Sequence, residues 1–213
     1  MRKVLKEDFA LTTEAVYLHP NTIEKRSVVL SKEKVKNREF LAVKNVLLQV
    51  GDRKNKNNRV YLWEELTKAV IAYINNKVNH EVSYGEFGHT DIDIVNLERV
   101  SHIIKNIKFD NSSKRIYGDI VILDFLPYGN MLKNYIERDF IVGISSRALG
   151  DIEEKKSDGD KYIEVKNIEI VCWDIVCTPS VHGAYLSDVM LEGENVTYKK
   201  SIFDGFSGFE IKK

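Results

Sequence analysis

The chain has 213 residues, enough for one domain, and 43% of them are hydrophobic, which suffices for a sizeable core. Its 32 basic and 32 acidic side chains give a formal net charge of zero, which argues against binding driven mainly by nucleic-acid phosphates or an anionic membrane surface. The sequence has no signal-peptide pattern and no apolar run of about 18 residues, so nothing directs it into a membrane. Cys172 and Cys177 lie too far apart on an extended segment to bridge, which predicts free thiols and a reducing cytoplasm.

The first half of the chain predicts an arm, a strand and a helix. Residues 1–40 are charged and weakly periodic, which indicates an irregular arm, although Val28–Leu30 could form a short strand. The segment Phe40–Val50 is rich in apolar and β-forming residues and stops at a Gly-Asp turn, as a buried strand does. Apolar residues then recur at helical spacing from Leu62 to Asn79, which predicts an amphipathic helix.

The second half is dominated by predicted strands. In chain order we expect a β-hairpin from His102–Phe109 and Arg115–Asp124, a short helix over Gly129–Asp139, a strand over 141–149, an acidic loop over Asp151–Asp160, and strands over Tyr162–Val165 and Ile168–Cys177. Nothing suggests regular βαβ alternation, so the predicted class is α+β, strand-dominated and barrel-like, with inserted helices. The predicted organisation is an arm over 1–40, one domain over 41–190 and a weakly ordered tail over 191–213.

A serine in the segment Val142–Gly150 is a candidate nucleophile. If 141–149 is a strand, the largely apolar set with even numbers, Ser146 included, faces the core, and Ser145 points the other way with Gly143 and Arg147. The neighbouring glycine leaves room for a substrate backbone, as pairing an extended peptide against a strand edge requires. This parity favours Ser145 over Ser146, and the alternative is a strand-end pair of serines bonded to backbone.

His89 is the candidate base. It ends the segment Gly85-Glu86-Phe87-Gly88-His89, and the other four histidines lack paired glycines. A flexible, exposed glycine-rich loop suits a residue that accepts and returns a proton near neutral pH. A serine hydroxyl is activated by such a base, so His89 and Ser145 form the hypothesis, and a merely solvated histidine is its alternative.

Two further residues fit this chemistry. Asp174 lies in an apolar stretch, where a carboxylate is costly unless a donor satisfies it. The donor could be the imidazole of His89, which Asp174 would then orient, or equally a backbone amide or a lysine. Arg147 could stabilise an oxyanion with backbone amides near Ser146, or it could be a surface arginine.

A metal-dependent hydrolase is an alternative, because Glu86, His89, Asp91 and Asp93 carry ordinary metal ligands. Their spacing matches no dedicated motif, and acidic loops are commonly solvated. The basic loop over 53–59 could contact phosphates, but it has no interleaved aromatic residues for stacking bases, which favours a solvated turn.

From about Val46 to Ser180 the sequence resembles the prohead core serine proteases of T-even-like tailed phages. The resemblance is carried by Asn57–Tyr61 before a helix, Gly85–His89, the Tyr117-Gly118 strand, Gly143–Arg147, and Asp174 followed by Pro179-Ser180. The family pattern has its histidine at the end of Gly-Glu-x-x-His and its nucleophile at the first serine of Gly-x-Ser-Ser-Arg, which implies these roles for His89 and Ser145. Thr90 and Ala148 depart from the proline and glycine that the family often has. In the related herpesvirus assemblins a second histidine is the third triad member, so the resemblance does not by itself assign that role to Asp174.

The resemblance implies a herpesvirus-protease-like barrel that needs no cofactor and works in the phage prohead interior, within the host cytoplasm. Its expected substrates are scaffold or core proteins and the major capsid protein, cleaved after glutamate in Leu/Ile-x-Glu contexts. No specific nucleic acid or membrane is expected as a partner, and the sequence is compatible with a homo-oligomer. Self-cleavage is expected at Glu7 of Leu5-Lys6-Glu7, because an irregular arm enters an active site easily. The remaining alternative is a non-catalytic capsid or tail protein on the same fold.

Overall fold

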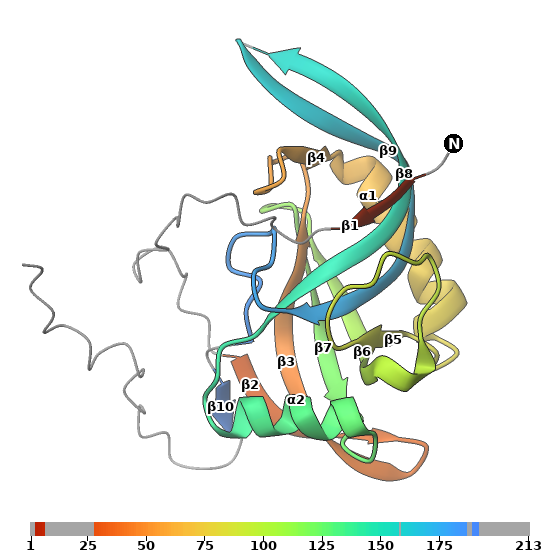
Figure 1. The fold of residues 1–213 in the computed structure, drawn as a ribbon, viewed down its shortest axis with the longest axis vertical. Coiled ribbons are helices and arrows are strands. Elements are labelled where there is room, and N and C mark those ends of the chain that lie inside the picture. The colour runs from red at the N-terminus through yellow and green to blue at the C-terminus, as the bar shows by residue number, and fades with distance from the viewer. Residues whose placement is uncertain (1–2, 7–27, 158, 187–188, 192–213) are drawn as a thin grey trace, which may run out of the picture.

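The computed structural model describes residues 3–6, 28–157, 159–186 and 189–191 (Figure 1). The elements in chain order are β1 (Lys3–Lys6), β2 (Val28–Val35), β3 (Arg38–Val50), β4 (Arg59–Tyr61), α1 (Trp63–Tyr73), the π-helical turn η2 (Ile74–Val78), β5 (Tyr84–Glu86), the 3-10 turn η3 (Leu97–Arg99), β6 (Val100–Asp110), β7 (Arg115–Ile122), α2 (Pro127–Glu137), β8 (Gly143–Ser157), β9 (Asp160–Val176) and β10 (Val189–Leu191). Among these residues, no helix has the length and apolarity needed to cross a bilayer.

The strands form two sheets. One has four strands in the order β1-β8-β9-β4, and the other has six in the order β10-β2-β3-β7-β6-β5. The pairings are antiparallel except for β10 with β2 and β4 with β9. The sheets meet at β9, where Phe87, the residue after β5, forms an isolated bridge with Ile175. This bridge brings the loop that follows β5 against the strand that contains Asp174.

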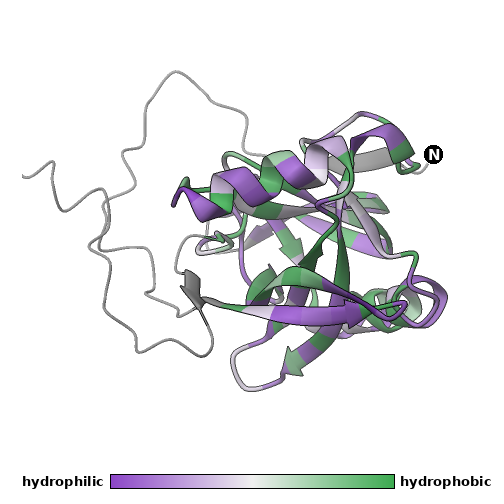
Figure 2. Ribbon diagram, turned by 90° about the horizontal axis from the view of Figure 1, so that it is seen from below, coloured by the Kyte–Doolittle hydropathy of each residue, from purple (hydrophilic) through white to green (hydrophobic). Residues whose placement is uncertain are grey.

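The two long strands and two helices give the domain its shape. Figure 1 shows β8 and β9 as a hairpin whose far end projects beyond the rest of the domain. Helix α1 packs against β9, and α2 packs against β6 and β7. Hydrophobic and hydrophilic residues alternate around the helices and along the strands (Figure 2), as expected for elements with one buried face.

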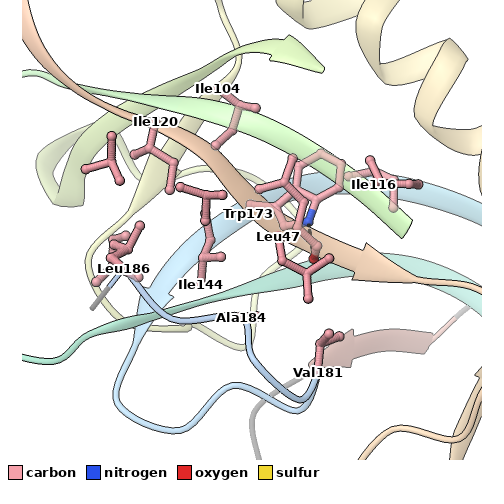
Figure 3. Packing of buried hydrophobic residues seen from close by; sticks show 14 of the residues in the cluster. Leu47, Ile104, Ile116, Ile120, Ile144, Trp173, Val181, Ala184 and Leu186 are labelled. Atoms are coloured by element: carbon pink, nitrogen blue, oxygen red, sulfur yellow. Dashed lines mark hydrogen bonds between the residues drawn. The ribbon is translucent and has the colours of Figure 1, made fainter. Parts of the chain in front are cut away.

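The core is built around Trp173 (Figure 3). Its ring is fully buried among residues that include Leu47, Ile116 and Ile144. The edge of the Tyr73 ring in α1 meets it at 4.9 Å between centroids, and its indole N–H donates to the carbonyl of Leu48 at 3.2 Å. Because successive residues of a strand point to opposite faces, a Trp173 fixed in the core directs Asp174 to the other face of β9.

The central elements predicted from the sequence are confirmed. The strand predicted over Phe40–Val50 is β3, the helix over Leu62–Asn79 is α1 with η2, and the hairpin is β6 with β7. The second helix begins two residues before the predicted start, at Pro127, because proline is tolerated in the first turn of a helix.

The acidic loop predicted over Asp151–Asp160 is wrong. Residues of this segment extend β8 and β9, with pairs such as Ile152 opposite Val165 and Lys155 opposite Tyr162. Charged side chains on this exposed hairpin support one another, since Glu153 lies 2.6 Å from Lys155 and 2.5 Å from Lys166. A solvated hairpin needs no apolar alternation on either face, so its composition looks like that of a loop.

The irregular arm predicted over 1–40 also contains strands. Residues 28–35 form β2, which pairs with β3 through a two-residue turn in which Lys36 and Asn37 have φ of 46° and 64°. Positive φ at both positions suits a tight hairpin, but lysine at the first position hides the usual Asn-Gly signal. Strand β1 pairs with β8. Residues 1–2 and 7–27 of the predicted arm and the tail from 192 lie outside the described residues.

The strand-dominated α+β class is confirmed, whereas a closed barrel is not seen in the part of the chain that the structure describes. One sheet ends at β1 and β4 and the other at β10 and β5, so both are open. They meet through the Phe87–Ile175 bridge and the shared core around Trp173.

Candidate active site

The register of β8 and β9 places Ser145 directly opposite Asp174. Directly opposite residues project from the same face of a sheet, so their side chains are neighbours. On the other face, Ile144 and Ala148 belong to the core cluster, and Ser146 Oγ accepts a hydrogen bond from buried Gln49 at 3.1 Å. The alternation predicted from the sequence therefore assigns each serine to the correct face.

Glycines hold the His89 loop close to β9. The N–H of Gly88 donates to the carbonyl of Ile175 at 2.7 Å, and Gly88 has a φ of 85°, which favours glycine. A Cβ at Gly85 would lie 2.1 Å from the carbonyl oxygen of Trp173. The sequence suggested a flexible, exposed loop, but the His89 side chain is only 3% exposed, because these close approaches press the loop onto the strand.

His89 and Asp174 are hydrogen-bonded, with 2.8 Å between Nδ1 and Oδ2. Burial raises the pKa of Asp174, but the hydrogen bond from His89 and the charge of Arg147 outweigh it, so the pKa lies below its ordinary value. An ionised carboxylate only accepts, which assigns the proton to Nδ1 of His89. The other ring nitrogen, Nε2, is buried without a hydrogen-bond partner among the described residues, so it can act as a proton acceptor.

Arg147 is fully buried on the Ser145 face, where it contacts the carboxylates of Glu86 and Asp174. Its guanidinium lies 2.6 Å from Glu86 Oε1 and 3.1 Å from Asp174 Oδ2. It also donates to the carbonyl of Ile92 at 2.9 Å and to the hydroxyl of Thr90, which ties down the chain after His89. Burial contradicts the surface alternative for Arg147. The contacts with Glu86 and the loop were not expected, because strand alternation does not reveal that the 86–94 segment covers this face.

Asp174 has more donors than the sequence indicates. Its Oδ1 accepts from the N–H of Glu86 at 2.9 Å and from the thiol of Cys172 at 3.1 Å. Burial raises the pKa of Cys172 well above its ordinary value, so it stays a thiol and a donor. The backbone bond and the imidazole bond are therefore both present. The sequence analysis overlooked Cys172, although its spacing of two from Asp174 puts both on one face of a strand.

Two residues of the metal alternative, Glu86 and His89, are engaged in ion pairs and hydrogen bonds. Glu86 lies between Arg147 and Arg99, with 3.4 Å from its Oε2 to Nε of Arg99, and Nδ1 of His89 is bonded to Asp174. A metal ion at Glu86 would face two guanidinium charges. Within the described ranges, no three His, Cys, Asp or Glu side chains are grouped as ligands for a metal ion.

A second histidine, His102, is fully buried behind the loop and is not part of this arrangement. Its Nε2 lies 3.1 Å from the carbonyl of Trp173 and its Nδ1 lies 2.9 Å from Ser101 Oγ. Burial lowers its pKa to about 4, despite the opposing effects of Asp174 and the Trp173 carbonyl.

This pKa predicts an acid-sensitive fold. Because the folded protein holds His102 neutral, the unfolded chain binds more protons between the ordinary pKa of 6.5 and about 4. The contribution of neutral His102 to the free energy of unfolding is therefore fully present above pH 6.5. It is lost as the pH is lowered towards 4, which reduces the free energy of unfolding by about 3 kcal/mol. Urea unfolding of wild type and His102→Gln between pH 4.5 and 7 measures this effect. Equal slopes of unfolding free energy against pH in both proteins would contradict it.

Glu7, the predicted self-cleavage residue, lies outside the described residues, one position after the end of β1. The other Leu/Ile-x-Glu sequences lie in regular structure. Glu64 is in the first turn of α1, and Glu154 is in β8, paired with Ile163. Opening these backbone segments for cleavage requires local unfolding, which protects them.

Comparison with known proteins gives a consistent result. A family model described as the prohead core protein serine protease matches residues 5–195. The chain is 29% identical over 135 residues to the prohead core protein protease of Enterobacteria phage T4, and the alignment covers 62% of each chain, less than two thirds of that relative. A solved structure of the bacteriophage T4 capsid assembly protease matches with a TM-score of 0.63 and 20% identity, covering 84% of this chain and 97% of that chain. This last likeness concerns the fold alone.

Proposed function

Because the chain belongs to the prohead core protein serine protease family, we propose that it is a serine endopeptidase that acts in prohead maturation. The observation that carries this proposal is the position of Asp174, opposite Ser145 across the β8–β9 pair and 2.8 Å from Nδ1 of His89. A nucleophile and a base that share one neighbouring, orienting carboxylate are the parts of a catalytic triad.

In this mechanism, Nε2 of His89 takes the proton of Ser145 while Oγ bonds to the carbonyl carbon of the substrate. The peptide C–N bond then breaks, and His89 returns the proton to the leaving amine. Water, deprotonated by His89, hydrolyses the acyl-enzyme and regenerates Ser145. Asp174 holds the tautomer of His89 and stabilises the imidazolium.

Backbone amides near Ser146 stabilise the oxyanion in this proposal. Arg147 is a positioning residue instead, because its guanidinium is bonded to Glu86, Asp174 and the loop after His89. It sets the charge and the place of Asp174 without touching the substrate.

The substrates proposed are scaffold or core proteins and the major capsid protein, cleaved after glutamate in Leu/Ile-x-Glu contexts in the prohead interior. The names of the similar proteins, a prohead core protease and a capsid assembly protease, support this setting. The reaction needs no cofactor, since base, nucleophile and orienting group are all side chains.

We predict self-processing at Glu7. The purified chain should acquire an N-terminus at Asp8, detected by intact-mass spectrometry, and the variant Glu7→Ala should slow this step by more than about tenfold. Glu154, in the exposed β8–β9 hairpin, is the matched control, because its replacement by alanine should leave the processing rate unchanged. Only intact N-termini in a preparation that cleaves other proteins would contradict the prediction.

Two alternatives give different results in the same assay. A structural capsid or tail protein would show no proteolysis in wild type but would lose assembly when its surface is altered. A metal-dependent hydrolase using Glu86, His89 and Asp91 would lose activity when a chelator is added.

A further inference from the structure

The basic loop over 53–59 packs against the segment that follows β9, although the sequence favoured a solvated turn there. The N–H of Lys56 donates to the carbonyl of Ser180 at 3.0 Å, and the side-chain amide of Asn55 donates to the Ser180 hydroxyl at 3.4 Å. Oδ1 of Asn55 accepts from the N–H of Asn57 at 2.9 Å, which closes a local turn. These bonds fix the point from which the Lys56 side chain extends.

The ammonium group of Lys56 lies beside the start of β8, on the same face of the sheet as Ser145. It donates to the carbonyl of Pro179 at 3.0 Å and lies 5.9 Å from the centre of the Tyr185 ring. Tyr185 forms an antiparallel bridge with Gly143, and directly opposite residues project from the same face. Gly143 precedes Ser145 by two residues, so both share that face and lie about 6.6 Å apart along the strand.

No carboxylate balances the charge of Lys56 in the part of the chain that the structure describes. The partners of its ammonium there are the Pro179 carbonyl and the Tyr185 ring, and the side chain is half-buried. Burial lowers the pKa of Lys56. Partial burial and the charge of Lys56 lower the pKa of the neighbouring His182, which therefore stays neutral at pH 7. A half-buried ammonium with unused donors is stabilised by an ionised carboxylate.

Two other cations near the site are already paired. Arg147 contacts the carboxylates of Glu86 and Asp174. Arg99 lies 3.4 Å from Glu86 Oε2 and donates to the carbonyl of Phe87 at 2.6 Å. An acidic side chain arriving at either arginine would meet a carboxylate of the protein, which would repel it. Lys56 presents a positive charge without this competition.

We propose that Lys56 is a specificity-determining residue, and that its ammonium binds the carboxylate of the substrate glutamate that precedes the scissile bond. A Cβ at Gly143 would lie 2.6 Å from the Pro179 ring, so Pro179 forms a wall beside the nucleophile. A peptide bond held at Ser145 places a flanking side chain along this wall, towards the ammonium. This inference rests on the proposed serine protease function, to which it adds the group that recognises the substrate.

The test compares two synthetic peptides, residues 1–12 of the chain and the same peptide with Glu7→Gln, which removes the charge and keeps the size. Wild type should cleave the glutamate peptide with a kcat/KM at least about tenfold higher, because a hydrogen bond between charged groups is lost with glutamine. In Lys56→Met this preference should fall below about threefold, mainly through KM. The preference is a ratio measured within one protein, so the folded fraction of each variant cancels.

Lys54→Met is the matched control. Lys54 lies in the same loop, and its ammonium is paired with Asp160. Its replacement removes the same charge from the loop as Lys56→Met does, but the preference for glutamate should stay as in wild type. An equal loss of preference in both variants would assign the effect to the net charge of the loop and would overturn the role of Lys56.

The remaining outcomes separate this inference from the protease function. Equal cleavage of both peptides by wild type, or an unchanged preference in Lys56→Met, would overturn the inference and leave the protease function standing. If wild type cleaves neither peptide, the protease function fails, and binding to Ser145→Ala decides instead. Tighter binding of the glutamate peptide that disappears on adding Lys56→Met would keep the carboxylate site, and equal binding of both peptides would remove it.

Discussion

Replacing Ser145 with alanine is expected to remove proteolysis, with kcat/KM for the peptide of residues 1–12 falling by roughly 10⁴-fold or more. Without the hydroxyl, His89 has no nucleophile to activate, although it keeps its bond to Asp174. The side chain is buried and loses a single oxygen, so the fold should persist. Cleavage followed by fluorescence, together with the N-terminal mass of the chain, measures both reactions.

Ser146→Ala is the matched control for this prediction. The Ser146 hydroxyl lies on the core face, where it accepts from Gln49, and its replacement leaves the backbone amide in place. We expect a loss of about 1 kcal/mol in stability from the missing hydrogen bond and less than about a tenfold loss in kcat/KM. Loss of cleavage in Ser146→Ala with retention in Ser145→Ala would exchange the roles of the two serines.

The sequence predicts the residues of this site better than their environment. Alternation along one strand separates Ser145 from Ser146, and a carboxylate inside an apolar run marks Asp174 as a residue that needs donors. Both arguments use only neighbouring residues within one strand, β8 or β9, so they are local in sequence. The 2.8 Å contact between His89 and Asp174 joins residues 85 positions apart, so no local pattern predicts it. The paired glycines selected this histidine, and the resemblance to a family added its role.

What covers a strand is less predictable than which face a side chain occupies. Arg147 shares its face with Ser145 as predicted, but that face is buried by the chain after His89 rather than open to solvent. Glu86 suggested a metal ligand because its charge was visible in the sequence, whereas its ion pair with Arg147 was not. The β8–β9 extension was overlooked for a related reason, since an exposed hairpin has the composition of a loop.

Replacing Arg147 with methionine should have the largest effect on stability. The change leaves the buried carboxylates of Glu86 and Asp174 without their shared cation, and breaking a buried ion pair in this way costs about 3–5 kcal/mol. Urea unfolding at pH 7 measures the loss. Arg147→Lys should restore only part of it, because a single ammonium group cannot reach both carboxylates and the loop carbonyl as a planar guanidinium does.

The double variant Glu86→Gln/Arg147→Met distinguishes an ion pair from simple packing. If the cost of Arg147→Met comes from an unpaired charge, neutralising Glu86 should make the double variant more stable than Arg147→Met alone. If methionine merely packs poorly, Glu86→Gln adds its own cost instead, and the charge explanation fails.

The pKa of Asp174 provides an independent test of the charge of Arg147. Without the charge of Arg147 it should rise, so the acid limb of the pH–rate profile should move to higher pH in every variant that lacks the guanidinium.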